Sequence, residues 1–122
     1  MTKISEVLIE SHKTRKKIRG GLIHFDINSN IDGYCALGAL ACAKGGEQEL
    51  KRGIMSFSSI VESYGVDPHI RVTYPLKRSH DNTIELVDAI WMLNDRKPDI
   101  GEWSFEDIGN WIKTLEDNGT IV

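Results

Sequence analysis

Residues 32–40 read DGYCALGAL, and this stretch decides the fold expected for the chain. A turn-forming Asp-Gly pair precedes a run of small and aliphatic residues that continues to Ala43 and stops at Gly45-Gly46. Asp32 can accept backbone N–H bonds as an N-cap, and glycines typically end a helix. The pattern therefore predicts a helix over residues 33–44. Because this helix is apolar nearly all round, we expect it to be the central, buried helix of the protein.

Gly38 stands in the middle of this predicted helix, where glycine costs about 0.5–1 kcal/mol relative to alanine. Its presence in an otherwise alanine-rich segment predicts a close approach by another backbone. The neighbour that we expect is the helix predicted over residues 83–94, contacting Gly38 through Ile84, Val87 or Trp91.

The rest of the chain is predicted to be mostly helical, because apolar residues recur every three or four positions between start and stop signals. We expect helices over residues 2–18, 47–64, 83–94 and 104–118, the second broken near Gly53 or restarted at Ser56. Capping boxes are predicted at residues 82–85 and 104–107, the latter with a Trp103–Ile108 staple. Alternating residues at 22–27 and 69–74 predict two strands that pair with each other. The expected fold class is mainly α: a single compact domain over residues 1–122, with about five helices and a possible short two-stranded β-ribbon.

Length and charge restrict the classes of protein to consider. The chain has 122 residues, enough for one domain with one core. Its net charge of −3 combines a balance of +4 over residues 1–20 with −7 over residues 81–122. Because nucleic-acid binding depends largely on phosphate neutralisation, the acidic C-terminal third confines such binding to the first helix.

The two cysteines, Cys35 and Cys42, indicate a reducing compartment. On one helix their Cα atoms lie roughly 10 Å apart, at 1.5 Å rise per residue. That separation is too large for a disulfide, so both should be free thiols. Free thiols, with no secretory signal and no apolar run long enough to span a membrane, predict a cytoplasmic protein.

Cys35 is the first candidate site residue, because it stands near the start of a helix. Unpaired N–H groups and the helix dipole lower the pKa of a thiol at such a position. A catalytic thiol also needs a base, for which His69 is the candidate, and an orienting group, for which Asn94 or Asp95 is the candidate. The alternative is that Cys35 packs as a small apolar side chain. The Ala, Gly and Leu residues around it favour packing, and predict a buried Cys35 with no histidine within hydrogen-bond distance.

Two further sets of residues are candidates for binding. A basic run at the end of the first helix could hold phosphates or an acidic partner, and two tryptophans, if exposed, could anchor a protein. These residues are Lys13, Arg15, Lys16, Lys17 and Arg19, together with Trp103 and Trp111. No metal or cofactor is expected, because the four histidines, His12, His24, His69 and His80, are scattered and no ligand-pair spacing occurs.

The segments CALGAL (35–40), LND (93–95) and SFEDI (104–108) occur in an order that resembles a family of small bacterial and phage proteins of unknown function, numbered 6197. The likeness covers residues 33–44 and 86–115, whereas Trp91, Met92 and the loop over residues 96–102 depart from the family's pattern. The resemblance implies a self-contained helical domain and no particular reaction. It also couples Cys35 to residues 94–95, which are among the shared positions.

The hypothesis favoured by the sequence is a small cytoplasmic helical protein that binds a protein or a small ligand and performs no chemistry of its own. The alternative is a cysteine-dependent hydrolase or transferase that uses Cys35 and His69. A second alternative is a nucleic-acid-associated accessory protein that binds through the basic end of the first helix. The sequence identifies neither the partner nor the oligomeric state.

Overall fold

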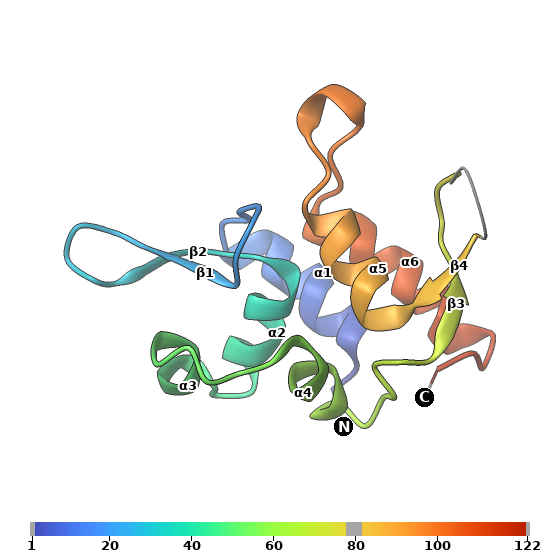
Figure 1. Cartoon of the computed structure of the whole chain (residues 1–122), viewed down its shortest axis with the longest axis horizontal. Helices are drawn as coiled ribbons and strands as arrows, with labels where there is room; N and C mark the ends of the chain where they lie inside the picture. Colours follow the sequence, from blue (N-terminus) through green and yellow to red (C-terminus); the bar gives the residue numbers. More distant parts are fainter. Residues whose placement is uncertain (1, 78–81, 122) are drawn as a thin grey trace.

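The computed structural model describes residues 2–77 and 82–121, and these residues form a mainly α-helical fold with short β-ribbons, as the sequence predicts (Figure 1). The described chain contains six α-helices, one 3₁₀ turn and two antiparallel two-stranded ribbons. In chain order the elements are α1 (Ile4–Thr14), β1 (Ile23–Phe25), β2 (Ile31–Tyr34), α2 (Ala36–Ala43), α3 (Glu47–Lys51), α4 (Phe57–Glu62), β3 (Arg71–Thr73), β4 (Thr83–Glu85), α5 (Leu86–Asn94), η1 (Pro98–Ile100) and α6 (Phe105–Asp117).

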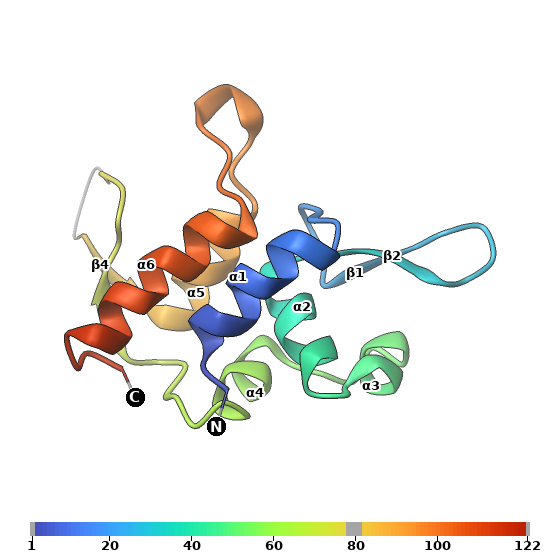
Figure 2. The same cartoon turned by 180° about the vertical axis from the view of Figure 1, so that it is seen from behind.

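Helix α2 lies in the centre of the core, as its apolar composition predicts. Its residues from Ala36 to Ala41 are buried, and it contacts α1, α3, α4 and α5. Helices α1 and α6 pack side by side over the other face of the core (Figure 2). Gly109 permits this close crossing, because a Cβ at that position would lie 2.9 Å from Ile9 Cγ1. The Ser5 hydroxyl donates to the Glu116 carboxylate across the same contact.

The start of α2 differs from the predicted one. Residues 31–34 pair with β1 and are therefore strand, so Asp32 is not the N-cap; its carboxylate instead pairs with His24 at 2.6 Å. The N-cap is Cys35, whose thiol sulfur accepts the Gly38 N–H at 3.3 Å.

Gly38 does sit at a close backbone approach, but the neighbour is not a helix. A Cβ at Gly38 would lie 2.0 Å from the carbonyl oxygen of Leu22, in the segment that leads into β1. The same carbonyl accepts the Cys35 N–H at 3.0 Å. The prediction of a close approach is confirmed, and the prediction that residues 84–91 make it is wrong.

The predicted pairing of residues 22–27 with residues 69–74 is also wrong. Both segments form strands, yet β1 pairs with β2 and β3 pairs with β4, so each strand finds its partner nearby in the sequence. Consequently residues 83–85 are strand and do not open a helix, and α5 begins at Leu86 without a side-chain cap. The capping box predicted at residues 82–85 therefore does not form.

The remaining helix boundaries follow from local and cross-chain hydrogen bonds. Helix α1 ends at Thr14, four residues earlier than predicted, because Ile18 and Lys16 bond to the backbone of Tyr34 in β2. The helix expected over residues 47–64 is divided into α3 and α4, with the restart at Ser56 that the sequence indicates. At α6 the predicted capping box, Ser104 with Asp107, is present in full.

Candidate functional site

Cys35 is buried at the N-terminus of α2, with 4% of its surface exposed. Burial is the main cause that raises its pKa from the ordinary thiol value of 9.0 to about 11, and outweighs the opposing effect of the Gly38 N–H bond. The thiol is therefore protonated at neutral pH and has the character of a packed side chain.

Asn94, the last residue of α5, lies beside this helix start and is fully buried. Its side-chain oxygen accepts the Ala36 N–H at 2.9 Å, and its amide nitrogen donates to the Ile18 carbonyl at 2.9 Å. One asparagine thus satisfies an N–H at the beginning of α2 and a carbonyl of the segment that follows α1. This is a structural role, since buried polar groups are costly when unpaired.

Asn94 thus forms a junction between the start of α2, the end of α5 and the segment after α1, and Asp95 and Lys17 extend this junction toward the surface. The Asp95 carboxylate accepts N–H bonds from Gly20 (3.0 Å) and from the Asn94 side chain (3.0 Å). The Lys17 ammonium donates to the Asn94 carbonyl at 2.8 Å and pairs with Glu102 at 3.4 Å. The structure therefore brings Cys35, Asn94 and Asp95 together around a helix start whose hydrogen bonds are satisfied.

His69 does not join this junction. It lies before β3, is exposed, and its ring Nδ1 pairs with the Glu85 carboxylate at 2.7 Å. The Cys35 sulfur takes its hydrogen bond from the Gly38 backbone, and no imidazole is bonded to it within the described ranges. The geometry therefore lacks the thiol–imidazole pair that nucleophilic catalysis requires.

The basic run near the end of α1 does not form a single cationic face. Lys13 pairs with Glu10 (3.9 Å), and the Arg15 guanidinium lies 5.6 Å from the centre of the Tyr34 ring. Lys17, with only 11% of its side chain exposed, faces the junction described above. The exposed members that remain are Lys16 and Arg19.

Helix α5 carries an exposed aromatic side chain, Trp91, which the apolar pattern of residues 84–93 places with the core. Trp91 is 37% exposed, whereas Leu86, Ile90 and Leu93 on the inward face are fully buried. The assignment of Trp91 to the core is therefore wrong. Its indole N–H donates to Asp88 Oδ1 at 3.2 Å, on the outward face of the same helix.

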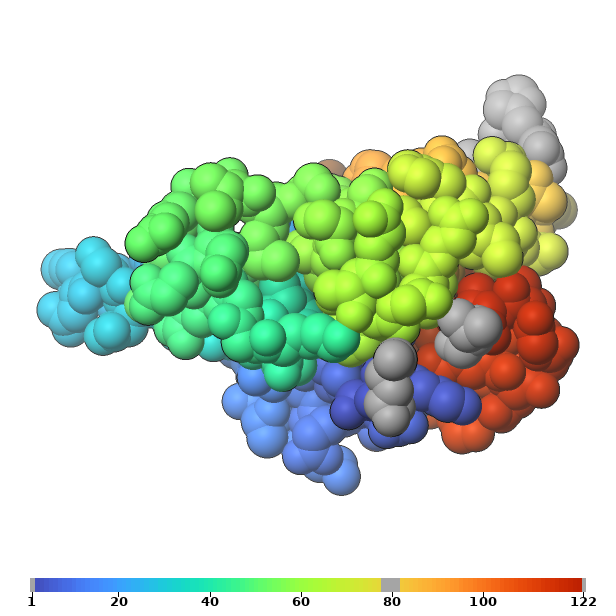
Figure 3. Space-filling view, turned by 90° about the horizontal axis from the view of Figure 1, so that it is seen from below, coloured from blue at the N-terminus to red at the C-terminus, as the bar shows by residue number. Residues whose placement is uncertain are grey.

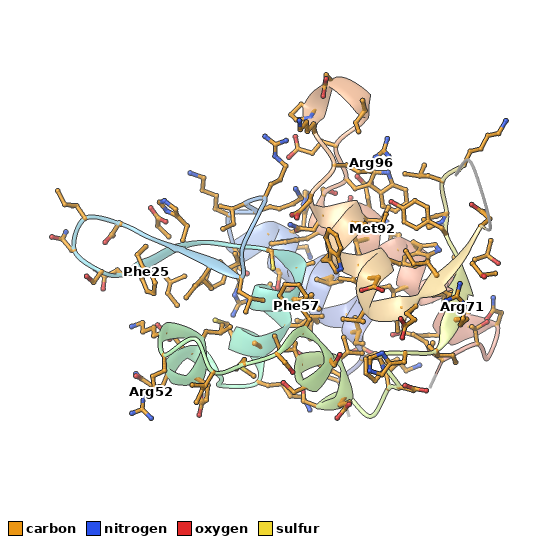
Figure 4. The ribbon with its side chains drawn as sticks, viewed as in Figure 1. Phe25, Arg52, Phe57, Arg71, Met92 and Arg96 are labelled. Atoms are coloured by element: carbon orange, nitrogen blue, oxygen red, sulfur yellow. The ribbon has the colours of Figure 1, made fainter. Side chains whose placement is uncertain are left out.

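A groove of about 570 Å³ lies between α5, the end of β3 and the loop that follows α5. Its apolar lining is Tyr74, Trp91, Met92 and Ile100, and Ile100 is 59% exposed. Figure 4 shows Met92 and Arg96 close together at the base of the projecting loop. The charged residues of the rim are Asp95, Arg96, Lys97 and Asp99. An apolar lining with a few charged groups around it is typical of a binding site.

The loop that forms one wall of this groove is held in shape by Arg96. Its guanidinium donates to the Gly101 carbonyl at 2.8 Å and also to the Ile100 carbonyl. Gly101 has a φ of 99°, a left-handed conformation that L side chains rarely adopt. Together with the Lys17–Glu102 pair, these contacts preorganise the wall.

The tryptophans proposed from the sequence lie outside this groove. Trp103 is half-buried and lines a second groove of about 470 Å³ on the other flank of the same loop, with Ile100 and Arg96 shared between the two. Trp111 is half-buried on α6. Helical spacing could not have identified Trp91 as exposed, because it follows the buried Val87 by four positions and precedes the buried Asn94 by three, which predicts a place with the buried stripe.

Neither a cluster of metal ligands nor a membrane-spanning helix occurs in the part of the chain that the structure describes. No three His, Cys, Asp or Glu side chains gather there as a metal site would require; His80 lies outside the described residues. No helix within the described ranges combines the length and apolar character needed to cross a membrane.

Comparison with family models, with curated proteins and with solved structures finds no match to this chain. The resemblance to the family numbered 6197 therefore stays a prediction, and the functional argument rests on the geometry of the groove.

Proposed function

We propose that this protein acts by binding, and that the groove between α5 and the loop after it accepts an apolar side chain from a protein segment. The observation that carries the proposal is the outward position of Trp91, beside the exposed Ile100, over an apolar lining. Exposed tryptophans set in grooves are frequent anchors of protein interfaces. The rim charges would then position the backbone of the bound segment.

The chemistry of the buried junction supports binding over catalysis. Cys35 is protonated at neutral pH and its neighbours are occupied in capping α2. The groove, in contrast, combines accessible apolar surface with a wall that is already in place. Preorganisation of this kind reduces the entropy cost of association.

Trp91, Met92 and the loop over residues 96–102 are also the places where the sequence departs from the pattern of the family that it resembles. The groove is built from these residues. We therefore expect the binding specificity to be particular to this chain.

Fragment titration followed by NMR tests the proposal. N-acetyl-isoleucinamide is added to ¹⁵N-labelled protein, and the indole N–H signals of Trp91, Trp103 and Trp111 are followed. We expect a saturable shift at Trp91 with an affinity of about 1 mM, given roughly 0.3 kcal/mol per heavy atom. N-acetylglycinamide, which lacks the apolar side chain, should leave the signal in place.

Two variants with matched exposure sharpen the test. Ile100→Asp places a charge in the groove and should abolish the shift, whereas Ile54→Asp alters a comparably exposed isoleucine (67%) outside the groove and should preserve it. An equal response at all three tryptophans, or no saturable response at any of them, would contradict the proposal.

A further inference from the structure

The tip of the β1–β2 hairpin displays one fully exposed isoleucine. Ile27 is 98% exposed, and the tip protrudes at one end of the molecule (Figure 3). Isolated exposed apolar residues are common on protein surfaces. Ile27 is distinguished by the loop that carries it, which is held in a defined conformation.

Asp26 holds this conformation. Its carboxylate Oδ1 accepts the N–H groups of Asn28 (2.8 Å) and Asn30 (3.0 Å), while its backbone bonds to Ser29 and Asn30. Ser29 completes the turn with a left-handed φ of 62°. Ile27 is therefore presented on a preorganised loop, which lowers the entropy cost of inserting it elsewhere.

We propose that the segment bound by the groove is the hairpin tip of a second copy of this chain, with Ile27 inserted against Trp91 and Ile100. This inference rests on the proposed function, because it names the occupant of the same groove. Figure 1 shows the hairpin and the loop after α5 projecting from different parts of the body, so the tip cannot fill the groove of its own chain.

The polar groups of the tip complement the rim of the groove. Asp95 and Arg96 are engaged by the protein's own backbone, which leaves Lys97 and Asp99, both exposed, to face an incoming segment. Around Ile27 the tip offers Oδ2 of the Asp26 carboxylate, whose Oδ1 accepts the N–H groups of the loop itself, as an acceptor for Lys97. The side chains at positions 28–30, two amides and a hydroxyl, are donors for Asp99.

In a two-fold symmetric dimer each chain inserts its tip into the groove of the other, so the contact is made twice and no further copies can add. A single inserted tip buries less than the ~1,000 Å² expected of a specific interface, and the second contact is needed to approach that area. We therefore expect a weak dimer that forms at high micromolar concentration. Phe25, 42% exposed on the same hairpin, adds apolar area beside the tip.

Sedimentation velocity over about 0.01–1 mM protein tests the inference. The wild type should show a concentration-dependent monomer–dimer equilibrium. Ile27→Asp and Ile100→Asp should each raise the dimer dissociation constant at least about 30-fold, as expected for the loss of a central anchor. Ile54→Asp is the matched control, and circular dichroism should show all three variants folded because each changes an exposed side chain.

A mixing experiment identifies the two sides of the contact. The Ile27→Asp protein keeps an intact groove and the Ile100→Asp protein keeps an intact tip, so an equimolar mixture regains one of two contacts and should associate more than either variant. Because one contact alone is weak, the mixture is followed by NMR: unlabelled Ile100→Asp protein should shift the Trp91 indole signal of ¹⁵N-labelled Ile27→Asp protein, and unlabelled Ile27→Asp protein should not. A wild type that stays monomeric to 1 mM, a dimer indifferent to Ile27→Asp, or a mixture without this shift would each overturn the inference. If the Trp91 indole still responds to N-acetyl-isoleucinamide in those cases, the groove binds and only its occupant has been misidentified.

Discussion

Replacing Gly38 by alanine tests how tightly the core helix is held against the hairpin. A methyl group at this position would lie 2.0 Å from the Leu22 carbonyl oxygen, about 1 Å inside the closest contact that Cβ atoms make. The obstructing atom is backbone, and it accepts the Cys35 N–H at 3.0 Å, so it cannot rotate away as a side chain would.

Three contributions set the magnitude. Overpacking costs about 1–3 kcal/mol, and weakening the Leu22–Cys35 hydrogen bond adds about 0.5–1.5 kcal/mol. Alanine regains about 0.5–1 kcal/mol of helix propensity. We therefore expect Gly38→Ala to lower the free energy of unfolding by about 2 kcal/mol.

Urea unfolding monitored by circular dichroism measures the change. With a slope of about 2 kcal/mol per molar urea, the midpoint should fall by roughly 1 M at unchanged slope. Gly109→Ala is the comparison, because the nearest obstruction there is the Ile9 side chain at 2.9 Å, which has rotamers to adopt, and the nearest backbone atom, the Ser5 carbonyl oxygen, is 3.1 Å away. It should destabilise less. A Gly38→Ala protein that is more stable than the wild type would refute the rigidity assigned to the Leu22 carbonyl.

Four other outcomes are expected. Ser104→Ala should reduce the free energy of unfolding by about 1 kcal/mol in urea melts, because it removes the cap of α6. Asn94→Ala should reduce it by about 3 kcal/mol, because the buried Ala36 N–H loses its partner, whereas a loss below 1 kcal/mol would show that water replaces the amide. The pKa of Cys35 is raised to about 11 in the folded protein, so the contribution of the protonated thiol to the free energy of unfolding is complete below pH 8. This contribution should decline by about 2 kcal/mol by pH 10.5, and Cys35→Ala should remove that decline. At neutral pH, iodoacetamide should modify the half-buried Cys42 before Cys35.

Local patterns predicted those features that residues of a single segment determine. The capping box of α6 needs only residues three apart, Ser104 and Asp107, and it forms as predicted. The close approach at Gly38 follows from the propensity cost of a mid-helix glycine. Which backbone makes that approach depends on Leu22, and no feature of the helix itself specifies it.

Pairings between separate segments of the chain account for most of the differences. Asp32 is a residue type that often occupies the N-cap position, but the pairing of β1 with β2 places it in a strand. The N-cap of α2 is therefore Cys35. The hydrogen bonds of Asn94 reach Ala36 and Ile18, 58 and 76 positions away, so the sequence around it indicates only a helix end. Helical spacing groups Trp91 with the buried Val87 and so does not predict its exposure, and the groove also needs the loop after α5, whose conformation depends on Arg96.

The hydrogen bond between Ser5 and Glu116 joins positions 111 residues apart, and Asn94 completes the first turn of α2 from the other half of the chain. During synthesis the ribosome therefore releases α1 and α2 long before their stabilising partners exist. The nascent chain leaves the start of its most apolar helix without the Asn94 hydrogen bond until α5 has emerged, and leaves α1 without its main packing partner until α6 has followed. We expect ribosome-bound intermediates shorter than this to be sensitive to protease and to engage chaperones, with native protection acquired only once α6 is free.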